Sequence, residues 1–203
     1  MEKIKATRME YLKLKKRLKT AERGFKLLKE KRDGLMKRFM EIIREAKQKR
    51  EDLENKFTLA SKNFAISTSS LMEKELEQMF SKPCSVIEIT SEKENIMSVW
   101  IPKFKYNIKG SLKCFSNFSS PLGMEDSLNK FKKAFAVMID LAGIEHSARL
   151  LSFEIEKTRR RVNALEYVLI PKMKQDIKFI ASKLDEQERS DKIVRMKVKD
   201  MIG

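Results

Sequence analysis

The side chains best suited to catalysis or metal binding are few and far apart in this chain of 203 residues. Its single histidine, His146, has Glu145 as a neighbour but no assignable nucleophile, so we interpret it as a surface histidine or one between paired helices. The two cysteines, Cys84 and Cys114, are too few for a disulfide framework or a cysteine-built zinc site, and we expect free thiols. We predict no metal and no cofactor.

The sequence contains no recognisable phosphate-binding motif. The six glycines form neither a GxGxxG loop nor a Walker pattern, which would present backbone N–H groups to a nucleotide. The adjacent acids Glu51-Asp52 and Asp185-Glu186 are interpreted as solvated helix faces rather than acid–base pairs. We therefore predict that the chain alone is not an enzyme.

The composition favours long, solvated helices over a thick globular core. Lys and Arg number 45 against 29 Asp and Glu, a net charge of +16, and charged residues reach 36% with only 6 Gly and 4 Pro. No apolar run approaches the roughly 20 residues that span a bilayer, and no apolar segment follows the charged N-terminus as in a secretory signal. We expect a soluble cytoplasmic protein without direct membrane insertion.

The charge is unevenly distributed and divides the chain into three parts. Residues 1–56 carry a net charge of +10, residues 57–128 are neutral, and residues 129–203 carry +6. Three of the four prolines lie in the neutral middle. We predict an N-terminal helix over residues 1–70, an insert over 71–121 and a C-terminal helix over 122–203.

Apolar residues recur every seven positions in the N-terminal part, in two series separated by alternating steps of three and four. This spacing places both series on one narrow stripe, as in the seam of a left-handed coiled coil. The predicted seam residues of this part are Leu14, Leu18, Ala21, Phe25, Leu28, Leu35 and Phe39.

A second apolar stripe in the C-terminal part predicts the partner helix, with seam residues Val162, Leu165, Leu169, Ile177, Ile180 and Leu184. The fold class predicted is therefore all-α dominated: a long antiparallel two-helix coiled coil with a small β-hairpin-bearing insert. If both termini lie at one end, facing residue numbers sum to about 205. Leu28 then meets Ile177, Phe25 meets Ile180, and Pro171, which predicts a kink or break, lies near Gly34.

The insert has a different pattern. Leu71 to Phe80 predicts a short helix, and the β-branched runs 86–90 and 96–101 predict a hairpin around a polar loop, Ser91 to Asn95. Pro83 and Pro102 are expected to end the strands, and residues 109–121 to form a loop. The hairpin residues of interest are Val86, Ile89, Ile96, Val99 and Trp100.

Longer motifs at both ends resemble the D subunit of the V-type and archaeal-type rotary ATPases. The N-terminal motif is LLKEKRDGL, residues 27–35, and the C-terminal motif RRVNALE, residues 160–166, is followed by Ile170-Pro171. The segment from Asn95 through Pro102 is similar to the family's middle, although Ser98 stands where glycine is expected. The resemblance covers essentially the whole chain.

This resemblance implies a central rotor shaft that transmits torque between a catalytic head and a membrane ion-translocating ring. The implied partners are the hexamer of A and B subunits, the F subunit of the central stalk and the C (or d) subunit above the ring, with the chain peripheral to the membrane. The residues expected to face the head or other partners are Lys13, Lys15, Lys16, Arg17, Lys29, Lys31, Arg32, Asp33, Arg160, Arg161, Asn163, Glu166 and Arg189.

Two alternatives remain at this point. A basic helical hairpin also suits nucleic-acid binding, because phosphate neutralisation requires little more than aligned Lys and Arg side chains. The aromatic residues Tyr11, Phe25 and Phe39 fall on the seam, however, where they are not available for base stacking. The γ shaft of F-type enzymes carries an α/β domain between its helices, and the insert here has room for a hairpin only.

Overall fold

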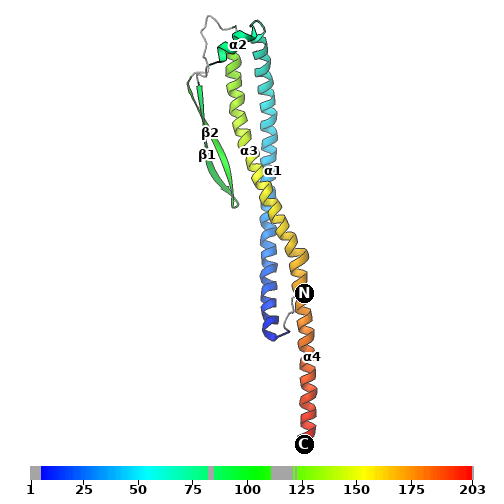
Figure 1. The fold of residues 1–203 in the computed structure, drawn as a ribbon. Helices are drawn as coiled ribbons and strands as arrows, with labels where there is room; N and C mark the ends of the chain where they lie inside the picture. Colours follow the sequence, from blue (N-terminus) through cyan, green and yellow to red (C-terminus); the bar gives the residue numbers. More distant parts are fainter. Residues whose placement is uncertain (1–5, 82–84, 111–120, 122, 203) are drawn as a thin grey trace. The chain divides into compact units, whose positions relative to one another are not determined.

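The computed structural model describes residues 6–81, 85–110, 121 and 123–202. Two long helical stretches are separated by a short helix and one β-hairpin, so the predicted fold class and the short helix of the insert are confirmed (Figure 1). The elements are α1 (Arg8–Thr68), α2 (Glu73–Phe80), β1 (Ser85–Ile96), β2 (Val99–Gly110), α3 (Met124–Ala164), the π-helical turn η1 (Leu165–Leu169) and α4 (Ile170–Ile202).

The described chain forms two compact units, each with its own pair of helical segments. The first unit contains the residues up to Gly34 and those from Ile155 onward, and the second contains Leu35–Glu154. In the first unit Arg8 contacts Glu188 and Glu22 contacts Lys174, so residue numbers rise on one helix as they fall on the other. The helical segments of this unit are therefore antiparallel.

The second unit has the same arrangement. Lys49 contacts Asp140, while Asn63, one turn from the end of α1, contacts Asp126 in the first turn of α3. Beside them Phe131 meets Phe64 edge-to-face, with ring centroids 5.9 Å apart. Hydrophobic burial along an antiparallel helix pair thus holds this unit together.

The buried residues follow a coiled-coil spacing. On α1, Leu14, Leu35 and Ile42 are buried at multiples of seven residues, and the intervening members of both predicted series are half-buried. On α3, burial alternates in steps of four and three between Leu151 and Val162. This 3.5-residue period keeps one stripe of each helix facing its partner.

The helices pair in a different register from the one predicted. Facing residues in the first unit sum to 196, as in Arg8 with Glu188 and Glu22 with Lys174, rather than to about 205. The predicted meetings of Leu28 with Ile177 and Phe25 with Ile180 are therefore wrong. The prediction assumed flush helix ends, whereas α4 continues past Glu188 through exposed residues only.

Pro171 neither breaks the helix nor lies near Gly34. The chain remains helical through it because a wide π turn, Leu165–Leu169, directly precedes it, with the Ile170 N–H donating to the Leu165 carbonyl. Such a turn accommodates a residue that cannot donate its own backbone hydrogen bond. It also shifts the stripe by one residue, so Leu169 is 42% exposed and is not a seam residue.

The hairpin is longer and its turn tighter than predicted. Strands β1 and β2 pair antiparallel from Ser85 with Gly110 to Ile96 with Val99, leaving only Met97 and Ser98 in the turn. Both turn residues have positive φ, 51° and 72°, which matches a two-residue turn of type I′.

The predicted five-residue loop, Ser91 to Asn95, is therefore wrong. Its polar side chains are those of a solvated strand, and Glu92 and Glu94 form ion pairs with Lys105 and Lys103 on β2. The prediction that Pro102 ends the second strand is also wrong, because β2 continues to Gly110. Pro83, both cysteines and residues 111–120 of the predicted loop lie outside the described residues.

We predict that truncating the seam weakens the first unit strongly. Ile180 is fully buried, so Ile180→Ala should lower the free energy of unfolding by about 2–5 kcal/mol, measured by urea denaturation followed by circular dichroism. Ile193 is 55% exposed on the same helix, and Ile193→Ala is the matched control with a change below about 0.5 kcal/mol. Equal effects of the two substitutions would contradict the assignment of Ile180 to the seam.

We also predict that glycine stabilises the hairpin turn. Ser98 adopts a φ of 72°, a conformation that costs an L-residue about 1–2 kcal/mol relative to glycine. Ser98→Gly should slow exchange of the hairpin amides about fivefold, as measured by hydrogen exchange. Ser91→Gly, in the middle of β1, should accelerate exchange instead, and slower exchange in both variants would refute the turn assignment.

Candidate functional site

The residues with catalytic potential do not assemble in the described chain. His146 is exposed on α3, and among the residues that the structure describes no three His, Cys, Asp or Glu side chains are grouped as a metal site. Within the same residues, no helix is long and apolar enough to cross a membrane. The candidates for partner binding are surfaces of the helices and of the hairpin.

The first candidate surface is the basic window of α1, defined as Lys13, Lys15, Lys16 and Arg17. All four side chains are exposed, and they flank the buried Leu14 of the seam. The Lys15 ammonium lies 5.8 Å from the centre of the Tyr11 ring. The same helical turns therefore bury apolar residues on one side and present a concentrated positive charge to solvent.

The motif residues farther along α1 are less uniformly solvated. Lys29 and Asp33 are exposed, whereas Lys31 and Arg32 are half-buried. The Arg32 guanidinium donates to Asp33 at 2.8 Å, which orients both side chains on the surface of the helix. Part of this predicted partner-facing group is thus engaged within its own unit.

The C-terminal motif residues lie around the π turn. Arg160, Arg161 and Asn163 are exposed on α3, and Arg160 pairs with Glu156 one turn earlier. Glu166 lines a cavity of about 460 Å³ between α1 and α4, beside the side chains of Phe25, Glu22, Ile170 and Lys174. Arg189 lines a separate polar depression on α4 with Lys178, Ser182 and Asp185.

At the end of α4 only Arg189 was predicted from the sequence to face a partner. All residues from Asp185 to Ile202 are exposed, including large apolar side chains at helical spacing. In the register of the first unit, Arg8 at the start of α1 pairs with Glu188, and these side chains lie farther along α4 than that pair. These exposed apolar residues are Ile193, Val194, Met196, Val198, Met201 and Ile202.

The second candidate surface is the hairpin. Val99 and Ile101 of β2 are each 8% exposed, whereas Trp100 between them is 61% exposed and Ile89 of β1 is 55% exposed. Alternate residues near the turn thus point toward the helices and away from them. Of the predicted hairpin residues, Val99 is buried, Ile96 is half-buried, and Val86, Ile89 and Trp100 are exposed.

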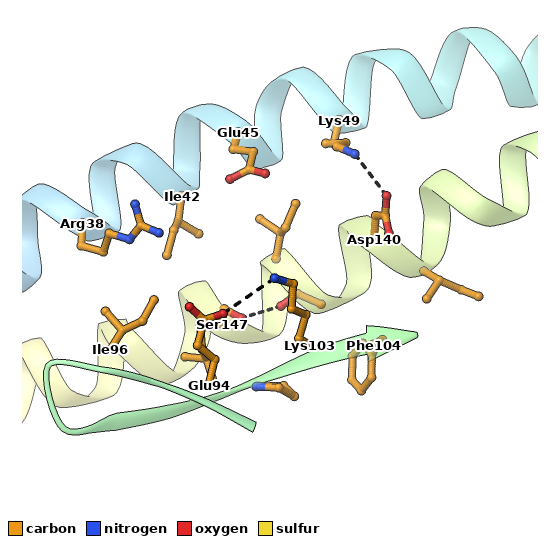
Figure 2. Close-up of a pocket in the computed structure, with 15 residues that line it drawn as sticks. Arg38, Ile42, Glu45, Lys49, Glu94, Ile96, Lys103, Phe104, Asp140 and Ser147 are labelled. Atoms are coloured by element: carbon orange, nitrogen blue, oxygen red, sulfur yellow. Dashed lines mark hydrogen bonds and ion pairs between the residues drawn. The ribbon is translucent and has the colours of Figure 1, made fainter. Parts of the chain in front are cut away.

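A cavity of about 430 Å³ lies where the hairpin meets α1 and α3 (Figure 2). Its apolar lining comes from all three elements, for example Ile42, Ile101 and Ile139. Charged side chains of both signs surround it, and Glu94 and Lys103 contact each other across the hairpin at 3.9 Å. The charged lining residues are Arg38, Glu45, Lys49, Glu94, Lys103 and Asp140.

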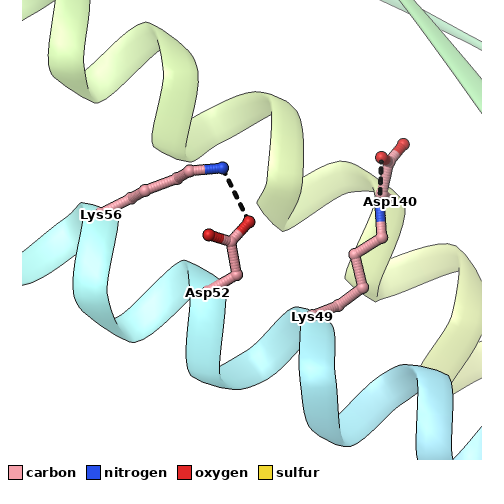
Figure 3. A network of polar contacts seen from close by, with 4 residues as sticks. All are labelled: Lys49, Asp52, Lys56 and Asp140. Carbon is pink, nitrogen blue, oxygen red and sulfur yellow. Dashed lines mark hydrogen bonds and ion pairs between the residues drawn. The ribbon is translucent and has the colours of Figure 1, made fainter.

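Ion pairs connect α1 and α3 at this cavity and beside it. Lys49 donates to Asp140 at 3.1 Å, and Asp52 accepts from Lys56 one turn along the same helix (Figure 3). Glu145 accepts from Arg50, and this hydrogen bond is the main cause of the raised pKa of the Arg50 side chain. Because these pairs are exposed to solvent, each contributes little to stability.

Comparison with known proteins matches the sequence of this chain to one family. The family model that describes the D subunit of ATP synthase matches residues 10–200, which include both long helical stretches and the hairpin. The chain belongs to the ATP synthase D-subunit family.

Relatives in this family align over nearly the whole chain. A V-type ATP synthase D subunit of Streptococcus pneumoniae (strain Hungary19A-6) is 44% identical over 198 residues, covering 97% of this chain and 98% of the relative. The D subunit of Clostridioides difficile (strain 630) is 44% identical over 98% of this chain and 91% of its own length. The D subunit of Thermoanaerobacter sp. (strain X514) is 41% identical over 98% of this chain and 96% of its own length. None of these findings supports the nucleic-acid alternative.

The start of α3 provides a testable electrostatic feature. A hydrogen bond from Lys130 lowers the pKa of the Asp126 carboxyl, with smaller contributions from Asn63 and Lys133. A carboxyl with a lowered pKa in the folded state stabilises that state above its unfolded pKa, and this contribution is lost as the pH falls through the folded pKa.

We therefore predict that the Asp126 titration midpoint, measured by carboxyl NMR, lies below the ordinary Asp value. Lys130→Met should raise the midpoint, and Asn63→Ala should raise it less, because the Lys130 bond is the largest cause. Asp126→Asn should reduce the loss of stability on acidification. An unchanged midpoint in Lys130→Met would contradict the assigned ion pair.

Proposed function

We propose that this chain is the central-stalk rotor shaft of a V-type ATP synthase complex, without catalytic activity of its own. The observation that carries the proposal is the family match over residues 10–200, which coincides with the paired helices. The shaft transmits torque between a hexamer of A and B subunits and the membrane ion-translocating ring. The F subunit of the central stalk and the C (or d) subunit are its other proposed partners, and it lies at the cytoplasmic side, peripheral to the membrane.

The helix pair in each unit suits the transmission of torque. Two helices that share a buried stripe resist bending and twisting more than one isolated helix, because deformation disrupts close packing along the stripe. Fully buried side chains occur in both units, for example Ile180 in the first and Leu151 in the second. Mechanical stiffness therefore follows from the same interactions that specify the fold.

The exposed charges suit a surface that must move past its neighbours. Exposed ion pairs contribute little individually and are screened beyond about 10 Å at 0.1 M salt. A buried hydrophobic hot spot would favour one orientation by several kcal/mol. The basic window of α1 can therefore attract a partner surface electrostatically without fixing a single angle.

We predict that the purified chain does not hydrolyse ATP and that it is required for coupling in its complex. A V-type complex reconstituted without the chain should lose ATP-driven ion transport into vesicles, and addition of the chain should restore it. Hydrolysis by the chain alone that survives repeated chromatography would contradict the non-catalytic role. Normal transport without the chain would contradict the rotor role.

We also predict that the basic window acts collectively. Single alanine substitutions at Lys13, Lys15, Lys16 or Arg17 should change turnover less than twofold, because each contact is weak and solvent-exposed. Reversal of all four to Glu should weaken assembly with the A and B subunits, and raising the salt concentration should reduce the difference from the native chain. If one single substitution abolishes turnover while its neighbours have no effect, the window is a specific contact instead.

A further inference from the structure

The two edges of the hairpin are in different environments, and the edge of β2 lies against α3. A Cβ atom built on Gly143 of α3 would lie 4.0 Å from both the Pro102 carbonyl oxygen and the Phe104 amide nitrogen, and 3.4 Å from the Phe104 ring. The first two are main-chain atoms of β2, so the strand approaches bare helix backbone at this position. Gly143 therefore marks the position where the edge of β2 packs against α3.

The edge of β1 is open in the described part of the molecule. All ten residues from Val86 to Asn95 are exposed, whereas β2 has buried or half-buried residues along its length. Among the described residues the sheet contains β1 and β2 only. A strand of 12 residues with one unpaired edge is unusually long for an unprotected edge strand.

The hairpin register identifies the backbone groups that this edge offers. Ile96 and Val99 flank a two-residue turn and form a hydrogen-bonded pair, so pairs alternate outward from them. The odd-numbered residues of β1 therefore direct their N–H and C=O groups away from β2, and the even-numbered residues of β2 direct theirs away from β1. The outward residues of β1 are Ile87, Ile89, Ser91, Lys93 and Asn95.

Proline occurs only on the covered side of this hairpin. Pro102 occupies an outward position of β2, opposite Lys93. Any other residue at this position would direct its N–H toward α3, and proline has no N–H to direct. On β1 every outward residue retains its N–H donor. The edge of β2, which packs on α3, thus lacks one outward N–H donor, whereas the open edge of β1 keeps every outward N–H donor.

We propose that β1 is a docking edge for an extended strand of another subunit of the ATP synthase complex. The inference rests on the proposed function, because it takes the occupant from that complex. The added strand pairs antiparallel or parallel with residues 86–95 and extends the hairpin to three strands, which are more stable in water than two.

The side chains of β1 specify the chemistry of the added strand. Ile87 and Ile89 are exposed on one face, while Glu88, Glu92 and Glu94 lie on the other. The matching strand alternates apolar residues with Lys or Arg, so that its cations extend the Glu–Lys ladder of the hairpin. A second copy of the chain is a poorer occupant, because β1 against β1 places the acidic residues Glu88, Glu92 and Glu94 of both copies on one shared face.

Hydrogen–deuterium exchange of individual β1 amides tests the proposal. In the free chain the odd-numbered amides from residue 87 to 95 should exchange quickly, and the even-numbered amides, bonded to β2, slowly. In the complex reconstituted with the chain, the odd-numbered amides should slow at least tenfold. Odd-numbered amides that remain fast in an assembled, coupled complex would overturn the proposal while leaving the rotor role intact. Protection that appears in the free chain with rising concentration would assign the edge to a second copy and also overturn it.

A matched pair of proline substitutions tests whether the protection depends on the open edge of β1. Ile89 and Tyr106 are directly opposed and both point their N–H groups outward, so Ile89→Pro and Tyr106→Pro introduce proline at the same level of the hairpin without removing a hydrogen bond between its strands. Only Ile89→Pro removes a donor from the open edge, and it should reduce the tenfold protection in the complex, whereas Tyr106→Pro should not. Ile89→Thr keeps the donor and should retain the protection. Equal loss of protection in both proline variants would overturn the proposal.

Discussion

One narrow stripe of apolar side chains on each long helix must be buried, and in each unit the stripes of two helices cover each other. On α3 the buried positions from Leu151 to Val162 alternate in steps of four and three, and on α1 Leu14, Leu35 and Ile42 are spaced at multiples of seven. A stripe of this width is covered by one partner helix and leaves the other faces of both helices in water. The high charge of the chain follows, because most of the helical surface remains solvated.

The same constraint shapes the hairpin and its attachment. A helix pair has no broad core into which an insert could be packed, so the hairpin rests on the outside of α1 and α3 through a few residues such as Val99 and Ile101. The edge of β2 meets α3 at Gly143, near the Pro102 carbonyl oxygen and the Phe104 amide nitrogen. The remaining side of the hairpin, including Trp100, is left for solvent or a partner.

Sequence periodicity predicted the helix pair because burial in a coiled coil repeats along the chain itself. It did not predict the register, because the seven-residue repeat permits any shift by a whole heptad and α4 extends beyond the start of α1. Leu169 was misassigned because a π turn inserts one residue, and the hairpin loop was misplaced because solvated strands and loops share polar residues such as Glu92. The partner-facing residues remain predictions, since an exposed Lys on a binding surface resembles one on any solvated helix.

The register of the helix pair in the first unit is the most direct test of this account. Spin labels at positions 22 and 174, in a background without the native cysteines, should give a short distance, because Glu22 and Lys174 form an ion pair at 3.5 Å. In a second pair, at positions 22 and 183, the α4 label lies nine residues farther along the helix, a shift of about 14 Å at a rise of 1.5 Å per residue, so the measured distance should be clearly longer. Double electron–electron resonance on both pairs distinguishes the registers. A shorter distance for 22 and 183 than for 22 and 174 would contradict the packing described here.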